Sequence, residues 1–211
     1  MYNLILYGGT FDPIHNGHLQ IALAVAHFFK PDQFSFMPCK VPLLKNKAQA
    51  DAQTRLAMIE LIIDQNPVFS ISRAEINRDG PSYTVDSLLH YRTIHGHDCS
   101  LSLLMGQDTF NQFPQWYKAE QILALANIIV IERMGFSGFN QKADTLLKQH
   151  ETTNYQHLKS SAAGLIYRFN AGLFAISSSQ IREKIQRHEH SISTLLPEKV
   201  YEYIMRWHLY K

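Results

Sequence analysis

Two adjacent glycines, a proline and two histidines lie together in the stretch from Leu6 to Leu23 (LYGGTFDPIHNGHLQIAL), between a short apolar segment and a helical pattern. Gly8 and Gly9 lack side chains, so the backbone there can approach a ligand closely. The helix is expected to begin near Asn16 or Gly17, and its N-terminus offers unpaired N–H groups and the positive end of a dipole. This combination predicts a phosphate site. It matches neither GxGxxG nor GxxxxGK[ST], which argues against an ordinary dehydrogenase or a P-loop enzyme.

His15 and His18 are three residues apart, and three interpretations of them compete. They could cap the turn. They could be a zinc pair, but no cysteine or carboxylate is obviously placed as a third ligand. They could also contact the phosphates of a nucleotide, where an imidazolium would offset the charge that builds on a transferring phosphoryl group. The phosphate interpretation is favoured because it explains the glycines and the histidines together.

A second candidate segment runs from Ile176 to Arg182 (ISSSQIR). Serines at a helix start cap it and can bind anions. Arg182 falls in the first turn, where its planar guanidinium could contact phosphate oxygens. Alternatively, Ser177 is only an N-cap and Arg182 is only a solvated helix residue. The glycine–histidine turn near the other end of the chain favours the phosphate interpretation.

Strand-like and helix-like stretches alternate along the chain that must position these residues. The expected strands are Asn3–Tyr7, Gln33–Met37, Phe69–Ile76, Leu101–Met105 and Asn127–Ile131, with Leu165–Phe169 and Phe174–Ile176 as weaker candidates. After the first helix, the expected helices are Asp51–Asp64, Ser82–His95, Tyr117–Ala126, Ser177–Arg187 and Pro197–His208. In the first helix, apolar residues recur at helical spacing at Leu19, Ala22, Leu23 and Ala26. In the third helix, the side chains expected to face inward are Val85, Leu88, Leu89 and Ile94.

This alternation predicts an α/β fold, a Rossmann-like doubly wound parallel sheet with helices on both faces. We expect one domain over residues 1–211, with a small C-terminal helical part over about 177–211. In such a sheet, ligands bind at the carboxyl ends of the strands, where the strand order reverses. The glycine–histidine turn follows a strand directly, as that rule requires.

The amino-acid composition argues against several classes of protein. The 211 residues are 45% hydrophobic and carry a net charge of +2, which argues against a protein that binds bulk DNA or an anionic membrane. Cys39 and Cys99 are far apart and belong to no CxxC pair, so they are expected to be reduced thiols. Since no signal peptide or membrane-length apolar run is present, a cytoplasmic location is expected. Oligomeric state is left open, a homo-oligomer included.

Both candidate segments resemble known motifs. Thr10–His18 (TFDPIHNGH), with the glycines before it, is similar to the H-x-G-H signature of the nucleotidyltransferases related to class I aminoacyl-tRNA synthetases. Ile176–Arg182 resembles their partner motif I-S-S-T-x-x-R, with Ser179 keeping a hydroxyl where threonine is usual. Gly80–Thr84 (GPSYT), Met105–Asp108 (MGQD) and Phe113–Tyr117 (FPQWY) resemble bacterial nicotinate mononucleotide adenylyltransferases. The resemblance covers nearly the whole chain.

That resemblance implies adenylyl transfer from ATP to nicotinate mononucleotide, which gives nicotinate adenine dinucleotide and pyrophosphate in NAD biosynthesis. The catalytic residues it implies are His15, His18, Lys45 and Arg182. Those implied for ATP are Gly8, Gly9, Thr10, Phe11, Gly106, Asp108, Ile176, Ser177 and Ser179. Those implied for nicotinate mononucleotide are Thr84, Trp116, Tyr117 and Arg133. Mg²⁺ is the implied cofactor, bound through ATP phosphates and water with no protein ligand.

The residues alone leave several roles open. Asp108 could accept a ribose hydrogen bond or hold a Mg²⁺-bound water, but it could equally cap the next helix. Trp116 and Tyr117 could be core aromatics rather than a stacking surface. The family often shows Pro-Pro-His-Lys after the second strand, whereas this chain has Leu44 in place of the histidine. If that histidine contacts phosphate in relatives, Lys45 or Lys47 could substitute for it here.

Two other functions stay open. A related adenylyltransferase could use nicotinamide mononucleotide or phosphopantetheine instead. The aromatic pair and the Ser82–Thr84 helix start favour a pyridine ring over a flexible thiol arm. Alternatively, the chain could be a catalytically inactive nucleotide-binding regulator, although the presence of both His18 and Arg182 argues against lost chemistry.

Overall fold

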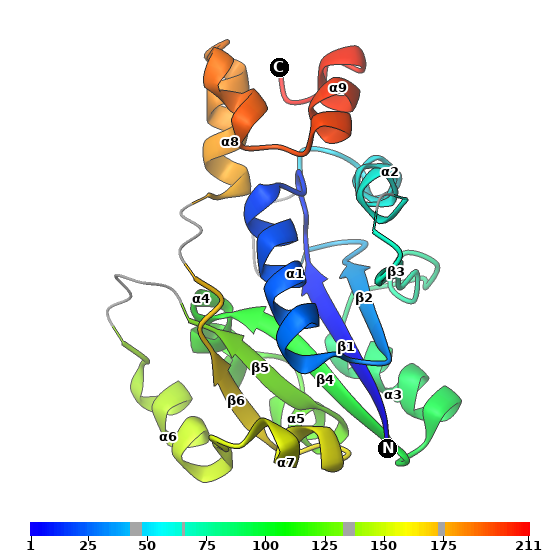
Figure 1. Cartoon of the computed structure of the whole chain (residues 1–211), viewed down its shortest axis with the longest axis vertical. Helices are drawn as coiled ribbons and strands as arrows, with labels where there is room; N and C mark the ends of the chain where they lie inside the picture. The colour runs from blue at the N-terminus through cyan, green and yellow to red at the C-terminus, as the bar shows by residue number, and fades with distance from the viewer. Residues whose placement is uncertain (43–47, 65, 133–137, 173–175) are drawn as a thin grey trace.

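The computed structural model describes residues 1–42, 48–64, 66–132, 138–172 and 176–211. Six strands form one sheet in the order β3-β2-β1-β4-β5-β6, and every neighbouring pair is parallel (Figure 1). The strands are β1 (Tyr2–Gly9), β2 (Gln33–Pro38), β3 (Phe69–Ile71), β4 (Cys99–Gly106), β5 (Asn127–Ile131) and β6 (Ile166–Phe169). The predicted Rossmann-like doubly wound sheet is therefore confirmed, and its order reverses between β1 and β4.

Helices cover both faces of this sheet. The apolar cluster on one face takes side chains from α1 (Asn16–Phe29), α2 (Ala52–Ile63), α7 (Tyr155–Ser160), α8 (Ser178–Gln186) and α9 (Glu198–Arg206). The cluster on the other face takes them from α3 (Thr84–His95), α4 (Gln107–Gln112), η1 (Phe113–Gln115), α5 (Ala119–Leu125) and α6 (Gln141–His150). The short η2 (His190–Thr194) connects α8 to α9.

The strands are buried on both faces, as near-continuous apolar runs predict for a parallel sheet. In β1, Ile5 and Tyr7 belong to the first cluster, whereas Leu4 and Leu6 belong to the second. β5 alternates in the same way, and all five of its residues are buried. Because consecutive side chains point to opposite faces, each central strand anchors both helical layers and holds its carboxyl end in place.

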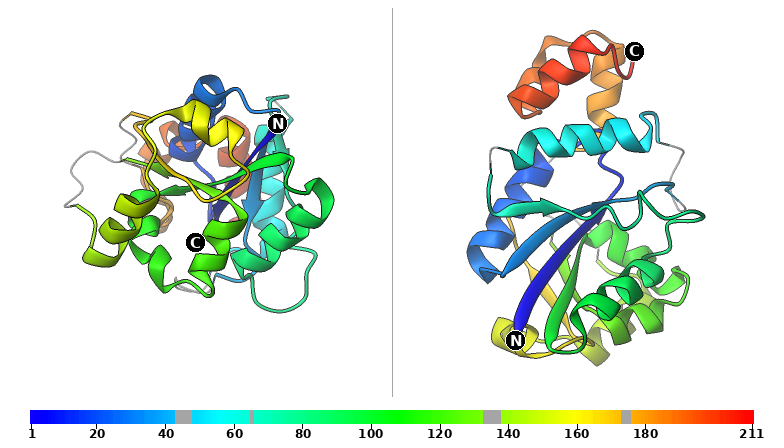
Figure 2. Two further views of the ribbon diagram at one scale, coloured as in Figure 1. Left: turned by 90° about the horizontal axis from the view of Figure 1, so that it is seen from below. Right: turned by 90° about the vertical axis from the view of Figure 1, so that its right-hand side faces the viewer.

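The C-terminal helices occupy a separate position. Figures 1 and 2 show α8 and α9 beyond the carboxyl ends of the strands, at the opposite end of the molecule from the N-terminus. Ile181, Val200 and Ile204 are fully buried there against the cluster that also contains α1 and α2. The C-terminal part therefore lies next to the edge of the sheet where the strands deliver their loops.

Several details differ from the sequence expectations. The strand expected over Phe69–Ile76 ends at Ile71. The Ser72 N–H still donates a hydrogen bond to the Phe36 carbonyl oxygen (2.8 Å), and beyond Ser72 the chain leaves this edge of the sheet. Leu89 and Ile94, expected to face inward, are exposed, and so is Leu23 of the first helix. Each helix buries only one stripe, and in α1 that stripe is formed by Gly17, Ile21, Ala22, Val25 and Phe29.

Other expectations were incomplete. The helices α4, α6 and α7 were not predicted. The weak strand candidate Phe174–Ile176 lies outside the described residues apart from Ile176, which is in no strand. Within the described ranges, no helix combines the length and hydrophobicity needed to span a bilayer.

Candidate functional site

A cavity of about 820 Å³ opens at the carboxyl ends of β1 and β4, at the point where the strand order reverses. Every predicted site residue within the described part of the chain lines it. These residues come from the glycine–histidine turn, α3, the start of α4, the start of α8 and the loop that carries Trp116 and Tyr117, called the aromatic loop below. Lys45 and Arg133, together with Leu44 and Lys47, lie outside the described residues. The fold thus brings together motifs that lie at opposite ends of the sequence.

The turn after β1 is shaped by Phe11, which has a positive φ of 51° and a buried ring. A Cβ added to Gly9 would lie 2.8 Å from that ring, closer than side-chain carbons approach one another. Glycine is therefore required at position 9 because the Phe11 ring folds back over the strand. The sequence expectation, close approach of a ligand to the backbone, did not include this side chain.

The two histidines cap α1 reciprocally. His15 Nδ1 accepts from the His18 backbone N–H (3.4 Å), and His18 Nδ1 accepts from the His15 backbone N–H (3.3 Å). The rings stack with centroids 3.7 Å apart, and a Cβ on Gly17 would press on the His15 ring at 3.1 Å. With Nδ1 accepting, the hydrogen of each neutral ring is assigned to Nε2.

This arrangement bears on the three interpretations of the pair. The histidines are caps, but both also line the cavity, so capping and phosphate contact are compatible. Among the described residues, no group of three or more His, Cys, Asp or Glu side chains is placed to hold a metal ion. The zinc interpretation therefore gains no support from the structure. A pair of Nε2–H donors suits an anion.

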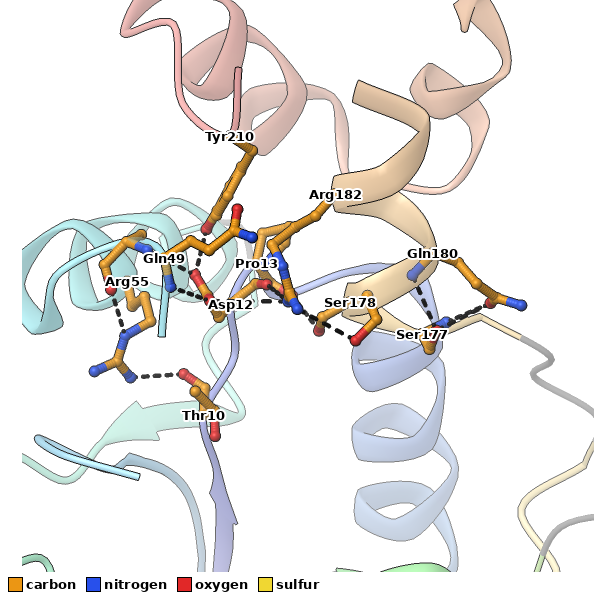
Figure 3. Close-up of polar contacts among 12 residues, drawn as sticks. Thr10, Asp12, Pro13, Gln49, Arg55, Ser177, Ser178, Gln180, Arg182 and Tyr210 are labelled. Carbon is orange, nitrogen blue, oxygen red and sulfur yellow. Dashed lines mark hydrogen bonds and ion pairs between the residues drawn. The ribbon is translucent and has the colours of Figure 1, made fainter. Parts of the chain in front are cut away.

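Asp12 was quoted within a motif but not predicted as a site residue, and it proves to be a centre of the hydrogen bonding around the cavity. Its carboxylate is 4% exposed and accepts from the backbone N–H groups of Gln49 (2.8 Å) and Ala50 (3.1 Å). It also accepts from the Tyr210 hydroxyl at 2.8 Å. Figure 3 shows Gln49 and Tyr210 reaching Asp12 from two separate segments, the loop before α2 and the turn after α9.

Arg182, at the start of α8, points toward the same residue (Figure 3). Its Nη1 donates to the Asp12 carbonyl oxygen (2.6 Å) and lies 3.8 Å from the carboxylate, while Nη2 donates to Ser179 Oγ (3.2 Å). Its Nε is buried and has no hydrogen-bond partner among the described residues. The guanidinium is therefore oriented by two protein acceptors, with N–H groups remaining for a ligand.

The serines of this segment have distinct contacts. Ser177 is the N-cap of α8 and forms a reciprocal capping box with Gln180. Ser178 donates to the Pro13 carbonyl oxygen at 2.9 Å, which ties α8 to the glycine–histidine turn. The two readings of Ser177 are thus compatible, because it caps the helix and also lines the cavity.

If Arg182 has the role in ATP chemistry that the sequence resemblance implies, Arg182→Lys is expected to lower kcat/KM for ATP by about tenfold or more. Lysine keeps the charge but lacks the planar fork that reaches Asp12 and Ser179 together, and hydrogen bonds to charged groups contribute about 1.5–3 kcal/mol. Steady-state kinetics with varied ATP measure the effect. Arg187→Lys is the matched control, since that exposed residue at the end of α8 does not line the cavity. An unchanged KM for ATP in Arg182→Lys would contradict the role.

Arg55 was missed by sequence reasoning because it is one polar residue within a helical pattern. It is 1% exposed and donates to the carbonyl oxygens of Thr10 (2.7 Å), Lys40 (3.0 Å) and Ala50 (3.2 Å). These carbonyls come from the β1 turn, the segment after β2 and the start of α2. Arg55 therefore joins three loop ends on one side of the cavity.

The aromatic side of the cavity combines packing and exposure. The Trp116 ring packs edge-on against Phe113, with centroids 5.6 Å apart, and its Nε1 is buried without a partner among the described residues. Tyr117 is 52% exposed and lies 4.5 Å from the Tyr83 ring. Both lining residues therefore present aromatic surface to the cavity, while Trp116 is also anchored in the apolar cluster.

Two helix starts face this cavity without a side-chain cap. α3 begins at Thr84, and its N-cap Tyr83 makes no side-chain capping bond. α4 has Gly106 as N-cap, so Asp108 lies in the first turn and is not the capping residue that the sequence left open. Uncapped helix starts offer backbone N–H groups, which suit anions and carboxylates.

Glu75 lines the same cavity and was not predicted, because it falls in the segment expected to be a strand. It is 4% exposed, and it accepts a hydrogen bond from Ser87 Oγ at 3.1 Å. Burial raises the pKa of Glu75 to about 7, while the Ser87 hydrogen bond and the charge of Arg78 oppose that rise. Its neutral form is therefore more populated near neutral pH than that of an exposed glutamate.

Comparison with known proteins gives a consistent result. The cytidylyltransferase-like family model matches residues 6–184. A relative from Legionella pneumophila (strain Paris), named "Probable nicotinate-nucleotide adenylyltransferase", is 39% identical over 215 residues, with 100% of each chain covered. The "Nicotinate-nucleotide adenylyltransferase" of Escherichia coli O6:H1 is 36% identical over 208 residues, covering 98% of this chain and 97% of that protein.

Solved structures agree on the fold. Plasmodium falciparum nicotinic acid mononucleotide adenylyltransferase complexed with NaAD superposes with a TM-score of 0.77 at 19% identity, covering 100% of this chain and 98% of that one. The same enzyme complexed with APC gives a TM-score of 0.74, also at 19% identity. At this identity the likeness is one of fold.

Proposed function

Because the chain belongs to the cytidylyltransferase-like family, and within it to the nicotinate-nucleotide adenylyltransferases, we propose that it transfers the adenylyl group of ATP to nicotinate mononucleotide in NAD biosynthesis. The products are nicotinate adenine dinucleotide and pyrophosphate. The observation that carries this proposal is the cavity at the switch point of the sheet. It is lined by His15 and His18 from one end of the chain and by Ser179 and Arg182 from the other.

The chemistry needs little from the protein beyond placement and charge. The nucleophile is the phosphate monoester of nicotinate mononucleotide, whose second pKa is about 6, so it is mostly dianionic at pH 7 without a general base. One of its oxygens forms a bond to the α-phosphorus of ATP, and the bond from that phosphorus to the bridging oxygen breaks. Pyrophosphate leaves with the electron pair. Catalysis therefore depends on in-line positioning and on stabilising the charge on the leaving group.

The described residues suit those two tasks. His15 and His18 present Nε2–H donors beside the start of α1, and Arg182 contributes a fixed positive charge at the start of α8. The N-termini of both helices add positive dipole ends. We assign His18 and Arg182 to the phosphates of ATP, and the aromatic loop with the start of α3 to the pyridine ring.

Mg²⁺ is part of the proposal, held by nucleotide oxygens and water rather than by a protein cage. The residues fit this mode, since the buried Asp12 carboxylate that lines the cavity already accepts three hydrogen bonds. Sites that bind Mg²⁺ largely through phosphates and water are usual. When bound, the ion would neutralise part of the negative charge on the nucleotide phosphates.

We propose a cytoplasmic location and small-molecule partners only, ATP and nicotinate mononucleotide. Cys39 and Cys99 are unpaired thiols, which suits a reducing compartment. A net charge of +2 gives no reason to expect nucleic acid or an anionic membrane as a partner. A homo-oligomer is left open by these observations.

The experiment that tests the function is pyrophosphate release from Mg·ATP with each acceptor in turn. We expect release with nicotinate mononucleotide, and much less with nicotinamide mononucleotide or phosphopantetheine. A reaction without acceptor is the control. ATP binding with no pyrophosphate release from any acceptor would instead indicate a nucleotide-binding regulator.

A further inference from the structure

The chain after α9 is folded back by an unusual backbone. His208 and Tyr210 have φ values of 50° and 65°, in the left-handed region that residues with a side chain rarely adopt. The Leu209 N–H bonds back to the Ile204 carbonyl at 3.1 Å, which closes this turn. The result is that Tyr210, the penultimate residue, is only 7% exposed. Unfavourable backbone conformations persist where surrounding contacts hold them.

The Tyr210 hydroxyl is the group that this turn places. It donates to Asp12 Oδ1 at 2.8 Å, across a sequence separation of 198 residues. Burial, and then the nearby Asp12 charge, raise the pKa of Tyr210, so the hydroxyl keeps its proton and remains a donor at any physiological pH. Tyr210 itself does not line the cavity. Its contact with the site therefore runs through Asp12.

Asp12 also contacts two other parts of the site, the segment that precedes α2 and Arg182. Its second oxygen accepts from the Gln49 N–H, and Oδ1 also accepts from the Ala50 N–H, so the carboxylate holds the segment that precedes α2. Its backbone carbonyl accepts from Arg182 Nη1 at 2.6 Å. A carboxylate with three donors has little freedom to rotate. Removing one donor loosens the residue on which the Arg182 guanidinium is oriented.

We propose that Tyr210 is a positioning residue of the adenylyl-transfer site, whose hydroxyl fixes Asp12 and, through Asp12, the Arg182 guanidinium. This inference rests on the proposed function, because it assigns Arg182 to the phosphates of ATP. It makes the last turn of the chain part of the machinery that binds nucleotide. A purely structural role would stabilise the fold and leave the kinetic constants for ATP unchanged.

The test is Tyr210→Phe, which removes one oxygen and keeps the buried ring. We expect kcat/KM for ATP to fall by about threefold to tenfold, the range expected for one hydrogen bond, mainly through a higher KM. ATP affinity measured directly by calorimetry should fall by a similar factor. Tyr201→Phe is the matched control, since its hydroxyl lies in α9 and has no hydrogen-bond partner among the described residues.

A second measurement separates positioning from packing. In an Arg182→Lys background, Tyr210→Phe should have little further effect on ATP affinity, because residues that act through one network are non-additive. Full additivity, or an unchanged ATP affinity with only a lower Tm, would overturn the inference while leaving the function intact. A wild-type protein that neither binds ATP nor releases pyrophosphate would overturn the proposed function and this inference together.

Discussion

Replacing His18 with alanine is expected to lower kcat by about 10² or more while the fold is retained. The variant loses one Nε2–H donor directed at charge that develops in the transition state, and removal of one such donor typically costs about 10²–10³ in kcat. The measurement is steady-state turnover with saturating Mg·ATP and nicotinate mononucleotide, alongside thermal unfolding. His27→Ala is the matched control, because His27 is an exposed residue in the last turn of the same helix.

The two histidines differ in burial, because His15 is buried and His18 is only partly buried. His15 is the N-cap of α1 and is 4% exposed, so His15→Ala should lose about 0.5–2 kcal/mol of stability with a smaller effect on kcat. His18 is the N3 residue, and His18→Ala should lower kcat more and stability less than His15→Ala does. Turnover close to wild type in His18→Ala would show that this turn binds nucleotide without taking part in catalysis.

The second large effect concerns the acceptor, where we expect kcat/KM for nicotinate mononucleotide to exceed that for nicotinamide mononucleotide by about 10² or more. α3 starts at Thr84 without a side-chain cap, and Trp116 Nε1 is a buried donor without a partner among the described residues. Both oxygens of a ring carboxylate can accept from such donors. An amide places its NH₂ against one of them and leaves that donor unpaired, which costs about 1–3 kcal/mol.

Glu75 adds a condition to this preference. Its carboxyl lies in the wall of the same cavity, and an ionised Glu75 would disfavour a ring carboxylate there. Because burial raises its pKa to about 7, the neutral form is well populated at and below neutral pH. The preference is therefore measured at pH 6.5, as initial rates against each mononucleotide at saturating Mg·ATP. Equal rates for the two would show that the ring pocket is misassigned even if adenylyl transfer occurs.

Much of this protein could be predicted from local sequence patterns. Buried strands such as Asn127–Ile131 were recognisable because a parallel sheet covered on both faces requires continuous apolar runs. The glycine–histidine turn and the ISSSQIR segment were recognisable because strand ends and helix starts carry characteristic residues. The exposed faces of helices were harder to predict, since Leu23, Leu89 and Ile94 follow an apolar pattern without being buried.

The sequence by itself determined the order of the six strands and of the helices other than α4, α6 and α7, and with it the edge of the sheet at which the motif residues meet. Only the tertiary structure decided how those residues are held. Asp12, Arg55 and Tyr210 make their contacts across gaps of up to 198 residues, and Glu75 becomes a cavity residue because the chain leaves the sheet edge before it. Periodicity reports on neighbours within one element. Hydrogen bonds between loops that the fold brings together have no such periodic signature.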